Sequence, residues 1–232
     1  MRITRKNRVA STLVAVIVGG ASLAAAPATV SAREAGGKAT VVHGVPGLTV
    51  DVYANGDTLL EDFVPGDIAG PVDLATGDYK IELTAADSSD VVLSANATIT
   101  DGANVTAAAH LTAAGDPAIG LFKNKMNPIR PRKARVSLRH IASAPPVDVR
   151  FRRPAGSWKL FAEDIGNGEQ ATRAVRKGKY RFDVVLAGTK SRVLGPTKLV
   201  LARRMHYFVY AWGSASEGNL ALNLSTQRLA RR

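Results

Sequence analysis

The sequence predicts an all-β protein of two tandem antiparallel β-sandwich domains, immunoglobulin- or transthyretin-like, preceded by a signal peptide. Short apolar segments separated by turn residues recur at intervals of about 8 to 12 residues, which is typical of a sandwich or barrel. No window of the 232-residue chain shows the periodicity of an amphipathic helix. A long internal repeat indicates that the domain occurs twice.

The repeat is clearest around two histidine–aspartate pairs, His43 with Asp51 and His140 with Asp148, which lie 97 positions apart. In both copies an apolar strand ends at the histidine and a proline-containing turn follows. The next strand then begins with Val-Asp-Val. Each half is long enough to bury its own hydrophobic core.

The first 32 residues have the features of a secretory signal peptide. Four basic residues precede a small and apolar run, and Val30-Ser31-Ala32 offers a cleavage site. Cleavage after Ala26 and retention of the run as a membrane anchor are the alternatives. We therefore predict an extracellular or wall-associated protein with a signal peptide at 1–32 and no other transmembrane segment. Its domains are expected at 33–126 and 134–232.

Turn residues divide each half into eight strands. Asn55-Gly56-Asp57 has the composition of a hairpin turn, and Gly77-Asp78-Tyr79 corresponds to Gly178-Lys179-Tyr180 in the second half, 101 positions later. Apolar and polar residues alternate strictly in Tyr79–Thr84, as in a half-buried strand. The predicted strands are 41–43, 48–54, 58–64, 70–74, 79–84, 91–100, 105–111, 118–122, 134–141, 147–152, 158–161, 170–175, 180–186, 193–201, 206–212 and 220–224.

The segment 127–133 joins the two domains. It contains Pro128 and Pro131, which remove backbone donors and favour extended conformations, so we predict a short, stiff and exposed linker. We expect the basic tail 228–232 to be frayed.

The formal net charge of +12 conceals opposite charges in the two domains. Residues 33–126 carry five Lys or Arg and thirteen Asp or Glu, a net charge of −8. Residues 127–232 carry twenty-two Lys or Arg and six Asp or Glu, a net charge of +16. Such asymmetry bears on association and on anionic partners rather than on fold. The absence of cysteine excludes disulfides, thiol chemistry and cysteine-based zinc sites.

Two motifs resemble those of a known family. The run His43–Gly56, His-Gly-Val-Pro-Gly-Leu-Thr-Val-Asp-Val-Tyr-Ala-Asn-Gly, resembles the signature of the secreted bacterial domain-of-unknown-function family 4397. The run Tyr210–Leu222, Tyr-Ala-Trp-Gly-Ser-Ala-Ser-Glu-Gly-Asn-Leu-Ala-Leu, resembles it too. The second copy departs at Arg150–Arg153, where Arg-Phe-Arg-Arg replaces Tyr-x-Asn-Gly. The resemblance implies an extracellular β-sandwich module, common in actinobacteria and present here in tandem copies, and it supplies no reaction.

The repeated residues His43, Asp51, His140 and Asp148 could form hydrogen-bonded pairs or half a metal site. Zinc normally takes three or four ligands, whereas only one histidine and one aspartate recur in each copy. We therefore favour a structural role. In that interpretation each aspartate lies on the outer face of its strand or caps the preceding turn, and the histidine holds that turn.

The second domain is expected to present a strongly cationic surface. In the strands 147–152 and 180–186 basic or acidic residues alternate with apolar ones, which places the charges on the solvent side. A solvated face that only maintains solubility is the alternative. The candidates for binding an anionic ligand are Arg150, Arg152, Lys179, Arg181, Arg173 and Arg176. Other basic residues of this half are Lys177, Lys190, Arg192, Lys198, Arg203 and Arg204.

One face of the predicted strand 206–212 carries His206, Phe208, Tyr210 and Trp212. We interpret this face as the inner face of the sandwich with a core tryptophan, rather than as an exposed row that stacks sugars. Trp158, which lies near a turn, is the better candidate for an exposed aromatic residue.

No enzyme signature is present. The chain lacks a nucleophile elbow, a phosphate-binding glycine loop and His-Glu-x-x-His, so we predict no catalytic residue, cofactor or metal. We predict a secreted, non-catalytic binding or adhesion module of the cell envelope. Its basic domain would dock on an anionic cell-wall polymer, lipid head groups or an acidic protein surface.

The alternatives to this function are a structural protein that self-associates through acidic-to-basic domain contacts and a wall-acting hydrolase. We do not expect a nucleic acid partner, because the export signal and the lack of a reading motif argue against one.

Overall fold

The computed structural model describes residues 35–231, in which every regular element is a β-strand. Residues Glu34–Arg232 form one compact unit. The predicted signal peptide lies outside the described residues. Among those residues, no helix has the length and apolar character needed to cross a membrane.

Each of the sixteen predicted strands is present. The first eight are β1 (Gly36–Gly44), β2 (Val50–Ala54), β3 (Asp57–Phe63), β4 (Ile68–Ala75), β5 (Gly77–Ala85), β6 (Val91–Ile99), β7 (Asn104–Leu111) and β8 (Pro117–Lys123). The next eight are β9 (Lys133–Ser143), β10 (Val147–Arg152), β11 (Lys159–Ile165), β12 (Gln170–Arg176), β13 (Gly178–Leu186), β14 (Arg192–Leu201), β15 (Met205–Ser214) and β16 (Ala221–Arg228).

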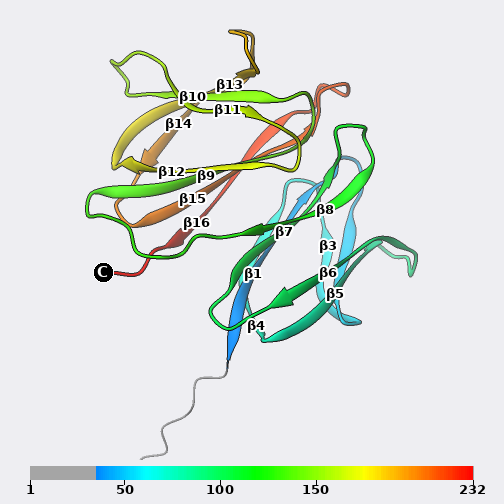
Figure 1. Cartoon of the computed structure of the whole chain (residues 1–232). Coiled ribbons are helices and arrows are strands. Elements are labelled where there is room, and N and C mark those ends of the chain that lie inside the picture. Colours follow the sequence, from blue (N-terminus) through cyan, green and yellow to red (C-terminus); the bar gives the residue numbers. More distant parts are fainter. Residues whose placement is uncertain (1–34, 232) are drawn as a thin grey trace, which may run out of the picture. The chain divides into compact units, whose positions relative to one another are not determined.

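The strands form four sheets, which pair into two sandwiches with the same strand order (Figure 1). Sheet A (β4-β1-β7-β8) and sheet B (β3-β2-β5-β6) make the first sandwich. Sheet C (β12-β9-β15-β16) and sheet D (β11-β10-β13-β14) make the second. Neighbouring strands are antiparallel except for one parallel pair in each sandwich, β1 with β7 and β9 with β15. The predicted all-β sandwich fold is confirmed.

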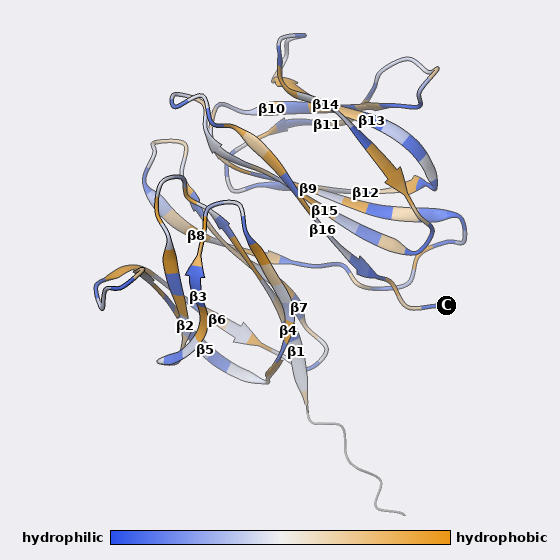
Figure 2. Cartoon of the chain, turned by 180° about the vertical axis from the view of Figure 1, so that it is seen from behind, coloured by the Kyte–Doolittle hydropathy of each residue, from blue (hydrophilic) through white to orange (hydrophobic). Residues whose placement is uncertain are grey.

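Each sandwich encloses its own core. In the first, Val41, Val50, Val52, Ile81 and Leu83 are buried together. The alternation predicted for 79–84 is confirmed, because Ile81 and Leu83 lie in this core with Tyr79 packed against it. The core of the second sandwich is richer in aromatic residues, namely Phe151, Phe161, Tyr180, Phe182 and Tyr207. Figure 2 shows the corresponding bands of hydrophilic and hydrophobic residues along the strands.

A third cluster of buried residues joins sheets A and C through the faces that point away from their own cores. Sheet A contributes Val42, Ala108 and Phe122, and sheet C contributes Phe208 and Tyr210. The predicted common face of His206, Phe208, Tyr210 and Trp212 exists, but its assignment to the inside of a sandwich is wrong. Tyr207 and Val209 contact the sandwich core instead.

Arg139 of β9 lies in this contact and is only 1% exposed. Its Nη1 donates to the Tyr210 hydroxyl at 3.0 Å, its Nη2 to Asn124 Oδ1, and its Nε to Gln170 Oε1 at 3.2 Å. The guanidinium also lies over the rings of Phe122 and Phe208. Burial lowers the pKa of Arg139. Within residues 35–231 no ion pair links the two sandwiches.

Asn127 and residues 130–132 of the segment between the sandwiches are exposed. Ile129 differs from the expected exposed linker, because it is buried, and the nearby Arg135 donates to the carbonyls of Lys125 and Asn127. The tail also differs from the expectation, because Leu229 is buried and its N–H donates to the Arg204 carbonyl at 2.8 Å. Apolar side chains anchor both segments.

Candidate anionic-ligand face

The outer face of sheet D collects the charged side chains of its strands. Phe151, Tyr180 and Phe182 contact one another in the core, so the residues that alternate with them point outward. On β14 the same alternation places Leu199 and Leu201 at the core and their neighbours outside. The face therefore follows from the period-2 pattern that the sequence displays.

Three cations lie side by side across this face. Arg152 of β10 is paired with Arg181 of β13, and Arg181 is paired with Lys198 of β14. We call Arg152, Arg181 and Lys198 the cation row. Side chains directly opposite each other on adjacent strands are about 5 Å apart at Cβ, and like charges in this position repel. Within residues 35–231 none of the three forms an ion pair.

At the next level of outward positions along the strands, a buried carboxylate offsets part of the positive charge. Asp183, whose side chain is fully buried, accepts from Arg150 Nε at 3.0 Å and Arg150 Nη2 at 2.7 Å. It also accepts from Arg192 Nε at 3.1 Å. The hydrogen bonds that Arg150 donates to Asp183 raise the pKa of Arg150. Asp183 therefore holds two of the face's guanidinium groups and cancels one of their charges.

Trp158 lies at the β11 end of the cation row. The guanidinium carbon of Arg152 is 4.9 Å from the centre of its ring, and that of Arg150 is 5.5 Å away. The indole is partly exposed. Stacking of this kind holds a guanidinium flat while leaving in-plane N–H groups for an acceptor.

The structure brings together four of the six candidate residues. Arg150, Arg152, Lys179 and Arg181 all project from the outer face of sheet D. Arg173 and Arg176 lie instead on β12 of sheet C. Arg173 reaches the edge between the sheets, where Nη1 donates to the Leu160 carbonyl at 3.5 Å, and Arg176 projects from the opposite side of its strand.

Sequence reasoning left three residues of this face off the candidate list, Lys198, Arg192 and Trp158. The alternation of β14 around Leu199 and Leu201 is a signal for Lys198. No local signal gives Arg192, because its contact with Asp183 depends on a register shift between β13 and β14.

The repeated histidines hold loops closed. His43 Nε2 is 2.6 Å from the Leu48 carbonyl, and His140 Nε2 is 3.0 Å from the Pro145 carbonyl. Burial is the main cause of the lowered pKa values of both histidines. Each ring thus spans the loop that joins its strand to the next one.

The repeated aspartates bind backbone N–H groups outside the preceding turn. Asp51 Oδ1 accepts from Asp62 N at 2.9 Å, and Asp148 Oδ1 accepts from Asp164 N at 2.8 Å. Asp62 and Asp164 have φ values of 51° and 50° and lie beside the register shifts of β3 and β11. Each aspartate therefore stabilises an irregularity in the neighbouring strand.

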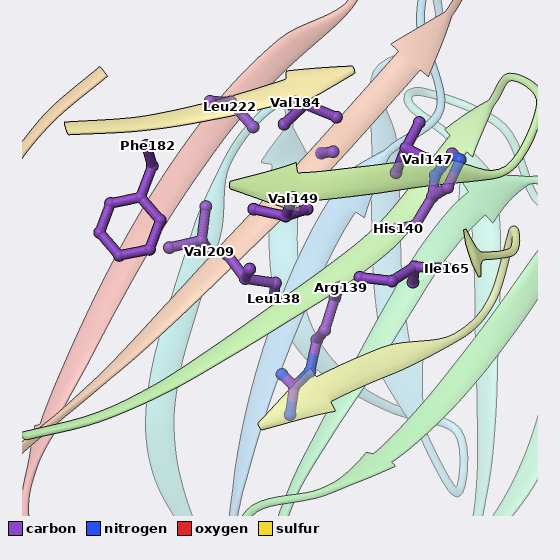
Figure 3. Close-up of a pocket in the computed structure, with 11 residues that line it drawn as sticks. Leu138, Arg139, His140, Val147, Val149, Ile165, Phe182, Val184, Val209 and Leu222 are labelled. Carbon is purple, nitrogen blue, oxygen red and sulfur yellow. The ribbon is translucent and has the colours of Figure 1, made fainter. Parts of the chain in front are cut away.

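The cavities near these histidines are small and apolar. A cavity of about 30 Å³ between sheets C and D is lined by Leu138, Val149, Phe182, Val209 and other residues. In Figure 3 the guanidinium of Arg139 points away from these side chains. Such a volume holds about one water molecule. Within residues 35–231 no cluster of three or more histidine or acidic residues could hold a metal.

No curated protein matches the sequence significantly. One similar solved structure is the Bacillus anthracis TIE protein, with 12% identity and a TM-score of 0.23 over 78% of this chain and 32% of that chain. The present chain thus spans about a third of that protein's length.

Two other similar structures are proposed cell adhesion proteins from Bacteroides. The protein from Bacteroides uniformis has 8% identity and a TM-score of 0.30, over 84% of this chain and 98% of that one. The protein from Bacteroides fragilis has 11% identity and a TM-score of 0.24, over 87% and 86%. TM-scores in this range establish neither a shared fold nor a shared function.

A family model gives a more specific match. Residues 37–150 match the family described as Domain of unknown function (DUF4397). The matched region runs through the whole first sandwich and into β10 of the second. This match supports the resemblance to the domain-of-unknown-function family that the sequence motifs indicated.

Proposed function

We propose that the protein is a secreted, non-catalytic binding module of the cell envelope that docks on an anionic surface polymer through the outer face of sheet D. The observation that carries this proposal is the cation row. Three positive side chains on adjacent strands, with no ion pair among the described residues, raise one another's electrostatic energy. An anionic ligand removes that repulsion and gains charge-assisted hydrogen bonds.

The net charge of the second half of the chain also supports this proposal, because it acts over a longer range than the cation row. The second half, residues 127–232 with a net charge of +16, attracts polyanions over roughly a Debye length, about 8 Å at physiological ionic strength. The electrostatic term raises the association rate and makes binding sensitive to salt. Exported polymers that carry phosphate or carboxylate groups have the chemistry that this face would recognise.

Assembly of copies through contacts between the acidic and the basic domain is the second candidate, favoured by their opposite charges. The contact between the sandwiches of one chain uses no ion pair within the described residues, so the charges on the outer faces are still available to another molecule. A heterologous contact of this kind need not close into a ring.

The test is binding of residues 33–232 to immobilised poly(glycerol phosphate) at low and high salt. We expect binding to weaken with salt and the variant R152Q/R181Q/K198Q to lose about 100-fold in affinity, at about 1 kcal/mol per cation. The control K123Q/R130Q/R176Q removes three exposed charges from other surfaces and should lose less than about fivefold.

Salt-insensitive binding, or equal losses in the two triple variants, would contradict the proposal. Salt-reversible oligomers in place of polymer binding, detected by analytical ultracentrifugation, would favour assembly through the two domains. The unfolding midpoint of each variant establishes that the loss does not come from misfolding.

A further inference from the structure

We infer that the cation row recognises a linear polyanion lying across β10, β13 and β14, and that the ligand is a phosphodiester-linked polyol chain. This inference rests on the function proposed above and specifies the ligand's chemical class and direction. It is carried by three features of the face: the line of cations that form no ion pair among the described residues, its less charged border and the indole at one end.

The first feature is the register. Arg152, Arg181 and Lys198 occupy one level of three adjacent strands, and neighbouring strands lie about 4.8 Å apart. Their backbones thus span about 10 Å at right angles to the strands. Long side chains can widen this spacing, so successive phosphates of an extended polymer can each meet one cation. A single phosphate can meet only part of the row.

The second feature is the border of the row. On one side Asp183 neutralises part of the charge of Arg150 and Arg192. On the other side Lys179 is paired with Val200, whose side chain is 64% exposed, so only one cation is present at that level. The net positive charge is therefore concentrated along the row, which carries three charges against one on either side.

A line of charge favours a chain over a lipid surface. A bilayer presents anions in two dimensions and is engaged best by basic residues together with a contiguous apolar patch. The exposed apolar side chains here, Leu160 on β11 and Val200 on β14, lie on opposite edge strands of the sheet. The cation-bearing strands β10 and β13 separate them.

The third feature is Trp158. Its partly exposed ring lies beneath the guanidinium groups of Arg150 and Arg152 at the β11 end of the row. An indole offers a flat amphipathic surface for the C–H groups of a polyol, and its stacked arginines keep donors for phosphate oxygens. A polymer that alternates phosphates with hydroxylated carbon segments matches both contacts.

The experiment measures affinity by calorimetry for glycerol phosphate oligomers of defined length, from one to six phosphates, at fixed low salt. We expect affinity to rise about tenfold with each added phosphate up to three, and afterwards only by the statistical factor for extra registers. Arg181→Gln should abolish most of this rise, because it removes the middle of the row. Lys179→Gln, on the same strand but outside the row, should lose less than about threefold.

The contact between Trp158 and the polyol is tested with the variant Trp158→Ala and two ligands. The variant should bind the glycerol phosphate trimer about fivefold more weakly, whereas its affinity for inorganic tripolyphosphate should fall less than about twofold, because that probe loses only the positioning of Arg152 by the indole. Thermal unfolding establishes that the variant is folded. An equal loss for both probes would remove the polyol from the proposal.

Three outcomes would overturn the inference and leave the proposed function intact. The first is binding of the long polymer that depends on the cation row although the affinity for the oligomers does not depend on their length. The others are equal losses of affinity in Arg181→Gln and Lys179→Gln, and tighter binding to phosphatidylglycerol vesicles than to the hexamer at equal phosphate concentration. Failure of the wild-type protein to bind the long polymer would instead contradict the proposed function and this inference together.

Discussion

The two sandwiches have the same strand order but carry different chemistry at equivalent positions of their outer faces. At the level of the cation row, the first sandwich has Asn55, Lys80 and Asn96. Lys80 pairs with Glu82 at 2.7 Å, and Asn55 accepts from the Lys80 backbone N–H. One neutralised cation thus stands where the second sandwich has three free ones. The outer face of a sheet can change charge without changing the fold, because the fold depends on the inner face.

The faces that join the sandwiches differ in the size of their side chains. Val42 and Ala108 of sheet A lie at the levels that Arg139 and Tyr210 occupy in sheet C. Small side chains on one face leave room for large ones on the other. The asymmetry lets two copies of one fold pack against each other, which two faces of large residues could not do as closely.

The largest expected effect comes from removing the buried guanidinium at this contact. Arg139→Ala removes the arginine's hydrogen bonds to Asn124, Gln170 and the Tyr210 hydroxyl, and it opens a cavity between Phe122 and Phe208. We expect the free energy of unfolding to fall by about 4 kcal/mol, measured by urea denaturation. The equivalent Val42→Ala should cost about 2 kcal/mol. A smaller loss for Arg139→Ala than for Val42→Ala would show that the arginine does not hold the contact.

The next effect compares equivalent carboxylates of the outer faces. Asp183→Asn should lower the free energy of unfolding by about 2 to 3 kcal/mol, because a fully buried carboxylate loses charge-assisted bonds to two arginines. Glu82→Gln should cost under about 1 kcal/mol, because Lys80 is 58% exposed. Equal losses in the two variants, measured by urea denaturation at neutral pH, would contradict this difference.

The interface also makes stability depend on pH. Burial, with Arg135 and Arg139 nearby, lowers the pKa of His206 to about 3, whereas its unfolded value is about 6.5. The unfolded state therefore binds more protons below pH 6.5, and stability is lost as the pH falls from there towards 3. His206 alone should remove about 2 kcal/mol between pH 7 and pH 5.

His206→Asn tests this, because the equivalent residue of the first sandwich is Asn104. The variant should lose about 2 kcal/mol less than the wild type over the same pH interval. Burial also lowers the pKa of His43, His110 and His140, so some acid sensitivity should persist. Identical pH profiles for the two proteins would exclude His206 as a source of acid sensitivity.

The smallest effect is a gain of binding by the first sandwich. In the R152Q/R181Q/K198Q background, Glu82→Gln frees Lys80 and Asn96→Lys places a second cation beside it. We expect affinity for poly(glycerol phosphate) to rise about fivefold. No gain would mean that charge at these positions is insufficient and that the second sandwich needs Trp158 as well.

Much of the fold could be predicted from local pattern. The alternation in strands such as β5 and β10, with turn residues between them, gave all sixteen strands, because side-chain period and turn chemistry are local properties. For the strand 206–212, the residues that share a face were predicted correctly, but this face was wrongly placed inside a sandwich. Both of its faces carry large apolar residues, Tyr207 and Phe208 among them, which is typical of a strand covered on both sides.

The candidate face could be predicted only in part. Alternation showed that Arg150, Arg152 and Arg181 point outward, but it could not show which of them share a level with Lys198 or that Asp183 neutralises Arg150. It also could not separate Arg173 and Arg176 from the rest, because membership of a sheet depends on pairing between distant segments.

By itself the sequence determined the strands, the two-part repeat and the opposite charges of its halves, since composition and period require no knowledge of distant contacts. The tertiary structure decided which cations lie side by side on adjacent strands and which carboxylate offsets the charge of neighbouring arginines. It also decided that Arg139 lies buried between two sheets. These properties depend on strand register and sheet packing, where a shift of one residue would turn every side chain to the other face.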